Sequence, residues 1–181
     1  RQLRRQMHRD FRKPLIIMTP KSLLRHKHCV SSLSDFSKKN TFHRVLWDHA
    51  IDPKVKGFIK LKKKEKIKKV ILCSGKIYFD LLEAREKFKR DDLIFYRIEQ
   101  LYPFPAKALA KELKPYAKKA KFYWCQEEPK NMGAWFSARD YIQWTLDNIK
   151  ANNKKISYIG RSPDASPCLL YTSPSPRDLY R

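Results

Sequence analysis

Two adjacent carboxylates, Glu127 and Glu128, follow a strand-like apolar run and precede Pro129. A pair of carboxylates that shares a proton can act as a general acid and base. Successive side chains of an extended strand point to opposite faces, so we do not expect Glu127 and Glu128 to share one. A carboxylate here is instead expected to cap the next helix or to form an ion pair across an interface.

A second candidate, Ser74-Gly75-Lys76, stands where another apolar run ends and a helical pattern begins. Backbone N–H groups at such a helix start can hold an anion. The spaced glycines of a P-loop or a dinucleotide fingerprint are absent, so a tight strand-to-helix turn is favoured. The five histidines are scattered and have no evident nucleophile or carboxylate partner: His8, His26, His28, His43 and His49.

The four cysteines, Cys29, Cys73, Cys125 and Cys168, show no paired close spacing. Cys73 and Cys125 lie inside apolar runs, where cysteine usually acts as a small buried hydrophobe. We expect neither a zinc site nor a disulfide framework, since both need clustered ligands or denser cysteines. A reducing, intracellular setting fits this usage.

The composition is strongly basic: 181 residues carry 41 Lys+Arg against 18 Asp+Glu, a net charge of +23. The length suits one domain, or at most two small ones. The lysine-dense connection over residues 60–69 is read as a solvated loop. A basic nucleic-acid-binding module is the alternative, but no helix-turn-helix, zinc finger or exposed aromatic platform supports it, so we expect no nucleic-acid partner. An anionic small molecule or a protein partner stays open.

Membrane association is not expected. The longest apolar runs, such as residues 15–18, are far too short to cross a bilayer. The charged first residues are not followed by an apolar stretch of signal length.

Short apolar runs are expected to form the strands, and most lack polar alternation, which is typical of strands buried on both faces. They cover residues 15–18, 70–73, 93–98, 122–125 and 156–159.

Helical patterns lie between these runs. A weak one spans residues 21–33. The next has an inward face of Ile77, Leu81, Ala84 and Phe88, with exposed pairs Glu83–Lys87 and Glu86–Arg90. Another begins at Pro105 and buries Leu109, Leu113 and Tyr116, and the last spans residues 134–148 and buries Ala138, Tyr141, Ile142, Leu146 and Ile149. This alternation predicts an α/β fold with a mostly parallel sheet and crossover helices.

The final residues, 168–181, differ in kind. They have no periodicity, and they match the translation of a widely used transposon adapter from DNA sequencing libraries. We expect residues 1–167 to be the natural domain and residues 168–181 to be a non-native tail.

Several strings together resemble one family. They are Met18-Thr19-Pro20-Lys21-Ser22-Leu23-Leu24-Arg25-His26, Leu72-Cys73-Ser74-Gly75-Lys76-Ile77-Tyr78, Arg97-Ile98-Glu99-Gln100-Leu101-Tyr102-Pro103-Phe104-Pro105, Trp124-Cys125-Gln126-Glu127-Glu128-Pro129-Lys130-Asn131-Met132-Gly133-Ala134-Trp135 and Tyr158-Ile159-Gly160-Arg161. In this order they resemble the C-terminal domain of 2-oxoglutarate dehydrogenase, in its first, decarboxylating component. The likeness covers residues 1–167.

The resemblance implies the C-terminal α/β domain of the transketolase-like dehydrogenases. It implies an enzyme that decarboxylates 2-oxoglutarate and passes the succinyl group to a lipoyl arm of the second component. Thiamine diphosphate and Mg²⁺ would sit between preceding domains of a homodimer, so this fragment is expected to hold no catalytic, cofactor or metal residue and to be inactive alone. The implied partners are the lipoyl-bearing succinyltransferase and dihydrolipoamide dehydrogenase.

The resemblance also implies an effector site for acetyl-CoA. Arg5 and Gln100 match the residue types of that pocket, and Lys107 replaces an arginine of some relatives, which keeps the cation without its bidentate fork. Thr41, Arg44 and Ala108 fall where those relatives carry other residues. We expect acetyl-CoA regulation to be weak or absent.

Two matters stay open at this level. A paralogue acting on another 2-oxoacid would look the same here, because substrate choice lies in the other domains. The lysine- and asparagine-rich composition favours a bacterial, cytoplasmic protein, or a mitochondrial matrix protein if the source is eukaryotic.

Overall fold

The protein is described by a computed structural model over residues 6–36, 41–52 and 55–166. It divides into two units, Arg1–His43 and Arg44–Arg181. In the first unit the described elements are short: 3₁₀ turns at Lys21–Arg25 (η1) and Leu33–Phe36 (η2), neither of which buries a residue.

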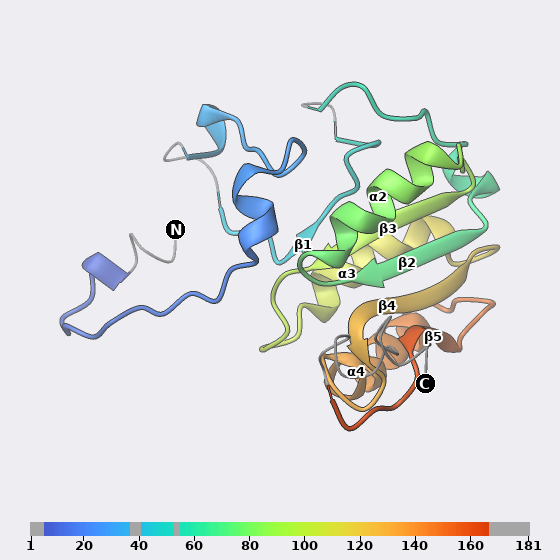
Figure 1. Ribbon diagram of the computed structural model, residues 1–181. Helices are drawn as coiled ribbons and strands as arrows, with labels where there is room; N and C mark the ends of the chain where they lie inside the picture. Colours follow the sequence, from blue (N-terminus) through green and yellow to red (C-terminus); the bar gives the residue numbers. More distant parts are fainter. Residues whose placement is uncertain (1–5, 37–40, 53–54, 167–181) are drawn as a thin grey trace, which may run out of the picture. The chain divides into compact units, whose positions relative to one another are not determined.

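The second unit is built on a five-stranded sheet in the order β1-β3-β2-β4-β5 (Figure 1). Strand β1 (Val45–Leu46) pairs antiparallel with β3 (Leu93–Ile98). The other pairings are parallel and join β3, β2 (Lys69–Cys73), β4 (Lys121–Pro129) and β5 (Ile156–Arg161). The predicted α/β class, with a mostly parallel sheet like that of transketolase C-terminal domains, is confirmed.

The three α-helices described in this unit are crossovers between parallel strands. Helix α2 (Ile77–Lys87) joins β2 to β3, α3 (Ala106–Leu113) joins β3 to β4, and α4 (Trp135–Asn148) joins β4 to β5. The β2–β3 connection runs across the sheet in the opposite direction to the other two. Right-handed crossovers therefore place α2 on one face and α3 with α4 on the other.

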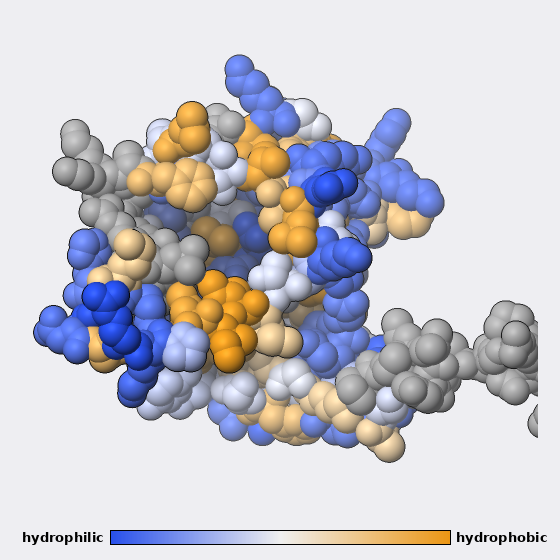
Figure 2. All heavy atoms as spheres, turned by 60° about the vertical axis from the view of Figure 1, so that its left-hand side comes forward, coloured by the Kyte–Doolittle hydropathy of each residue, from blue (hydrophilic) through white to orange (hydrophobic). Residues whose placement is uncertain are grey.

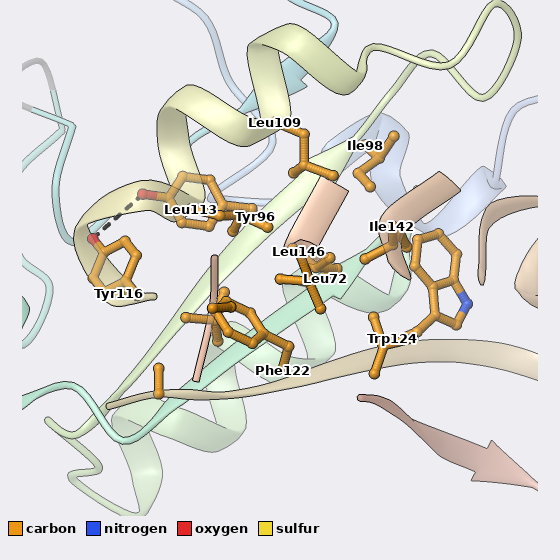
Figure 3. Packing of buried hydrophobic residues seen from close by; sticks show 14 of the residues in the cluster. Leu72, Tyr96, Ile98, Leu109, Leu113, Tyr116, Phe122, Trp124, Ile142 and Leu146 are labelled. Carbon is orange, nitrogen blue, oxygen red and sulfur yellow. Dashed lines mark hydrogen bonds between the residues drawn. The ribbon is translucent and has the colours of Figure 1, made fainter. Parts of the chain in front are cut away.

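The face under α3 and α4 holds the main core (Figure 3). Alternate strand residues Leu72, Tyr96 and Trp124 meet helix residues Leu109 and Ile142, all with 2% exposure or less. Tyr96 donates a hydrogen bond to the hydroxyl of Tyr116 over 3.4 Å, so the polar ends of two buried rings satisfy each other. The helix predicted to start at Pro105 starts one residue later, at Ala106, and the predicted burial of Leu109, Leu113 and Tyr116 is confirmed, with Tyr116 in the 3₁₀ turn Lys114–Tyr116 (η4) that follows.

The predicted strand at residues 15–18 is wrong. These residues are neither strand nor helix, and their side chains are exposed, from 38% for Leu15 to 91% for Met18. Among the described residues no neighbouring strand pairs with this run, and an apolar run without a paired neighbour does not make a strand. The weak helix predicted at 21–33 is reduced to the two 3₁₀ turns.

The predicted inward face of α2 is wrong by one position. The helix buries Tyr78, Phe79, Leu82 and Arg85, while Phe88 is 68% exposed. Apolar residues occupy both faces of its first turns, so the hydrophobic pattern does not decide which face of the helix points inward. The buried Arg85 adds to the error, because an arginine is normally assigned to the exposed face. The predicted Glu86–Arg90 pair is also wrong, because Arg90 lies beyond the helix and pairs with Asp92 at 2.9 Å.

Helix α4 follows its prediction at Ala138, Ile142 and Leu146, but Tyr141 is 50% exposed, contrary to expectation. Its ring stacks on Phe104 with centroids 5.1 Å apart. Figure 2 shows how surface character is mixed on one face of the molecule: hydrophilic side chains in blue project around smaller apolar areas in orange. Among the described helices none has the length and apolar character that a bilayer crossing needs.

Candidate functional site

The strand order marks one position at the carboxyl edge of the sheet where a ligand could bind. The connection after β2 leaves toward β3, and the connection after β4 leaves toward β5, on the other side. In open α/β sheets, ligands bind where neighbouring strands send their connections in opposite directions. The motif Ser74-Gly75-Lys76 and the carboxylate Glu127 are brought together at this point.

Lys76 forms ion pairs with two carboxylates at this edge of the sheet. Lys76 Nζ lies 3.0 Å from Glu127 Oε1 and 3.3 Å from Asp80 Oδ2. The hydrogen bond to Glu127, assisted by Asp80, raises the pKa of Lys76 above its ordinary value, so the lysine stays charged. Of the two roles expected for the Glu127–Glu128 pair, an ion pair is present at Glu127, but its partner lies within the same chain, so a pair across an interface stays a prediction. The residue that precedes α4 is Ala134, and it forms no side-chain cap, so neither glutamate takes the predicted capping role there.

Gln126 organises the loop that follows β4. Its Oε1 accepts the indole N–H of Trp124 and the backbone N–H of Trp135, each at 3.0 Å. Its Nε2 donates to the carbonyls of Pro129 at 3.0 Å and Met132 at 2.7 Å. This side chain therefore fixes the β4–α4 loop from inside, a role that the sequence did not reveal.

The opposite face of the sheet contains a buried charge cluster that the sequence did not reveal either. Arg85 Nη1 and Nη2 contact Asp48 Oδ2 and Oδ1, the second at 2.9 Å, and both side chains have 1% exposure or less. Asp48 also accepts the backbone N–H of Phe95 at 2.9 Å. At the end of β3, the guanidinium of Arg97 stacks over Tyr78 at 4.4 Å. The pairing joins residues 37 positions apart, which no short-range motif reports.

The three residues predicted to bind acetyl-CoA differ in what the structure shows of them. Arg5 lies outside the described residues. Gln100 follows β3, and its Nε2 donates to the Pro103 carbonyl at 2.6 Å, so one amide donor holds the loop. Lys107 is exposed in the first turn of α3.

Backbone hydrogen bonds hold Arg44 next to this loop, one of the three positions where relatives with the acetyl-CoA pocket carry other residues. The Arg44 carbonyl accepts the N–H groups of Glu99 at 3.0 Å and Gln100 at 3.3 Å. Thr41 belongs to the first unit, and Ala108 packs partly buried against the core. The structure thus groups Arg44 with Gln100 at one loop whose far end leads to Lys107.

The predicted burial of Cys73 and Cys125 is confirmed. Cys73 and Cys125 are buried, and burial raises the pKa of both thiols, whereas Cys29 is exposed. Cys168 lies outside the described residues. Within the described ranges no three His, Cys, Asp or Glu side chains are placed to hold a metal ion.

Comparison with known proteins identifies the family. The family described as 2-oxoglutarate dehydrogenase C-terminal matches residues 30–174. Proteins named 2-oxoglutarate dehydrogenase E1 component from Brucella abortus and Brucella anthropi are each 58% identical over 165 residues, and the one from Brucella ovis is 57% identical.

Each of these matches covers 91% of this chain and 16% of the relative, so the chain spans about a sixth of the length of those proteins. The matched range includes the whole sheet, the Lys76–Glu127 ion pair and the Asp48–Arg85 cluster. On this evidence the chain belongs to the 2-oxoglutarate dehydrogenase C-terminal family.

Proposed function

We propose that this chain is the C-terminal part of the E1 component of a 2-oxoglutarate dehydrogenase. That enzyme oxidatively decarboxylates 2-oxoglutarate and transfers the succinyl group to the lipoyl group of the second component. The observation that carries the proposal is the 58% identity to such components over 91% of the chain. The parallel sheet supports it, because the fold is that expected of the domain.

Thiamine diphosphate and Mg²⁺ belong to the proposal as cofactors of the whole enzyme, bound outside this fragment. The diphosphate-bound Mg²⁺ and the thiazolium ring would supply the anchoring and the electron sink. The described residues do not fit that group: Asp80 and Glu127 at the carboxyl edge are engaged with Lys76, and no metal-ligating cluster is found among the described residues. We therefore propose that this chain is inactive alone.

The proposed role of the domain itself is structural, in a homodimer. The succinyltransferase and dihydrolipoamide dehydrogenase are the proposed further partners, in the bacterial cytoplasm or, in a eukaryote, the mitochondrial matrix. The buried Asp48–Arg85 pair and the Gln126 network support a rigid scaffold, since each fixes a loop or strand by several hydrogen bonds.

A chimera tests the proposal. Residues 1–167 replace the corresponding region of the Brucella abortus E1 component, and NADH formation from 2-oxoglutarate is measured with the other two components added. We expect a dimer that retains activity. The matched control carries Asp48→Ala in the same chimera and is expected to lose both activity and dimer through misfolding.

Two results would decide against the proposal. A folded, dimeric chimera without activity on 2-oxoglutarate would contradict it directly. If the intact protein of the source organism instead turned over a different 2-oxoacid, the paralogue would be the better assignment.

We keep acetyl-CoA as a proposed weak ligand of Arg5, Gln100 and Lys107. The hydrogen bond from Gln100 to the Pro103 carbonyl supports weak binding of acetyl-CoA. A donor already used at 2.6 Å must be released before it can bind a ligand. Calorimetry of acetyl-CoA with the intact enzyme is expected to show little heat. Tight binding that Arg5→Ala abolishes would overturn this expectation.

The division of the chain is also a proposal. Residues 1–167 would be natural and residues 168–181 adapter-derived. A finished genome sequence that reads through the last fourteen codons in the natural gene would contradict it.

A further inference from the structure

The amino edge of the sheet gathers lysines from segments that are far apart in the sequence. Lys69 and Lys121 are paired partners at the starts of β2 and β4, whose arrows begin at the same edge in Figure 1. Phe122 pairs with Ile156, so Lys155 stands level with Lys121. Three lysines thus form a row across neighbouring strands, at a strand spacing of about 4.8 Å.

Hydrogen bonds fix the adjoining segments to this row. The N–H of Lys121 donates to the Lys68 carbonyl at 2.8 Å. Asn152 Nδ2 donates to the Lys118 carbonyl at 2.9 Å. We call the resulting set of exposed side chains the lysine edge: Lys62, Lys63, Lys64, Lys66, Lys68, Lys69, Lys118, Lys119, Lys121, Lys154 and Lys155.

Little of this charge is neutralised. Lys62 pairs with Asp91 at 2.9 Å, and the nearby Asp92 is engaged by Arg90. Among the described residues, no other member of the lysine edge forms an ion pair. Like charges on adjacent strands repel, so the row of Lys69, Lys121 and Lys155 works against the fold instead of stabilising it.

The carboxyl edge of the same sheet is different. There Lys76 faces Glu127 at 3.0 Å, and Arg161 lies 3.8 Å from Asp164. A lysine-rich composition by itself would not leave one edge paired and the other uncompensated. The asymmetry points to a negatively charged partner at the amino edge.

We propose that the lysine edge is a docking surface for an acidic segment of a partner protein. The Cβ atoms of residues i and i+4 on a helix are about 5–6 Å apart, close to the spacing between neighbouring strands, so an acidic helix face can meet the row residue by residue. Complementary charge of this kind accelerates encounter and fixes orientation.

Nucleic acid is the disfavoured occupant. Besides phosphate contacts from lysine, its interfaces commonly add the planar fork of arginine and stacked aromatic rings. The arginine at this edge, Arg90, is held by Asp92. The ring that a lysine-edge side chain contacts, Tyr123 under Lys69 at 5.8 Å, is half-buried within β4.

Fluorescence anisotropy with two labelled probes tests the proposal on the 181-residue chain. The probes are a short poly-L-glutamate and an oligothymidylate of the same formal charge, both measured at low and at physiological salt. The edge variant is Lys69→Glu/Lys121→Glu/Lys155→Glu. The control, Lys56→Glu/Lys111→Glu/Lys130→Glu, changes the net charge equally at exposed lysines outside the edge. Circular dichroism checks that the edge variant and the control are folded. If the edge variant is misfolded, the variant with Lys→Gln at the same three edge positions is used in its place.

We expect salt-sensitive binding of poly-L-glutamate that the edge variant weakens at least about tenfold and the control much less, which supports the proposal. Equal loss in both variants would overturn it, since net charge alone would then explain the binding. Absence of poly-L-glutamate binding would overturn it too. Tighter oligothymidylate binding with the same dependence on the edge would replace the acidic partner with nucleic acid.

Discussion

Asp48 and Arg85 form a bidentate ion pair that is excluded from water: the two side chains have 0% and 1% exposure. Asp48 reaches from the segment after β1, and Arg85 from the last turn of α2, so the pair ties this edge of the sheet to the helix. Asp48 also accepts the N–H groups of Phe95 and Ala50, each at 2.9 Å, which satisfies the carboxylate further.

Breaking this pair from one side is expected to be costly. Arg85→Met leaves the Asp48 carboxylate buried without its cation, and the free energy of unfolding should fall by about 3–5 kcal/mol. Urea titration followed by circular dichroism measures it. The double variant Asp48→Asn/Arg85→Met should recover part of the loss, because no uncompensated charge remains. A single variant within about 1 kcal/mol of the parent would contradict this account.

Gly133 is expected to tolerate no side chain. Its φ of +66° is unfavourable for other residues, and an added Cβ would lie 2.8 Å from Gln126 Nε2. Gly133→Ala must therefore displace the amide that holds the β4–α4 loop, and should lower the free energy of unfolding by more than about 1 kcal/mol.

Gly75→Ala is the matched control for that substitution. Gly75 has a similar φ of +70° with open space around the added Cβ, so it reports backbone strain alone. Thermal unfolding of both variants should show the larger drop for Gly133→Ala. Equal drops would mean that the contact with Gln126 has no energetic weight.

The strands and helices of the fold were easier to predict from the sequence than its contacts between charged side chains. The run at 93–98 becomes β3 without change of bounds, because a run that is apolar except for Arg97 suits a strand with both faces largely buried. The run at 15–18 has the same character and fails, since a strand also needs a neighbour. Periodicity could not find Asp48–Arg85, because an arginine that is buried through a distant carboxylate looks like a surface residue.

The candidate site was predicted only in part for a similar reason. Glu127 was expected to form an ion pair, but its partner Lys76 lies on another strand-to-helix turn, and topology alone brings the two together. The role of Gln126 depends on two tryptophans and three carbonyls that surround one amide, and no spacing rule encodes that arrangement.

Acid sensitivity is expected at the start of β3. The side-chain hydrogen bond from Arg90 lowers the pKa of Asp92 below its usual value. A carboxyl group whose pKa is lower in the folded state stabilises the fold above its unfolded pKa, and that contribution is lost as the pH falls through the folded value. Arg90→Gln should therefore lower the stability only slightly at neutral pH, because the guanidinium is exposed and water screens its attraction to Asp92. Once the pH is below the folded pKa of Asp92, parent and variant should unfold at the same urea concentration. A gap that persists in strong acid would assign the effect to packing.

Thiol reactivity should separate the described cysteines. Burial raises the pKa of Cys73 and of Cys125, so few of these thiols are ionised at mild alkaline pH, and the thiolate is the nucleophile. Cys29 is exposed. Iodoacetamide at pH 8 should therefore label Cys29 in the native protein and spare the other two, as peptide mass spectrometry would show, whereas all three should react in urea. Cys125→Ala provides the control, because labelling of Cys29 should stay unchanged in it. Rapid native labelling of Cys73 would mean that the carboxyl ends of β2 and β4 open to solvent, and the rigid scaffold proposed for this domain would then be wrong.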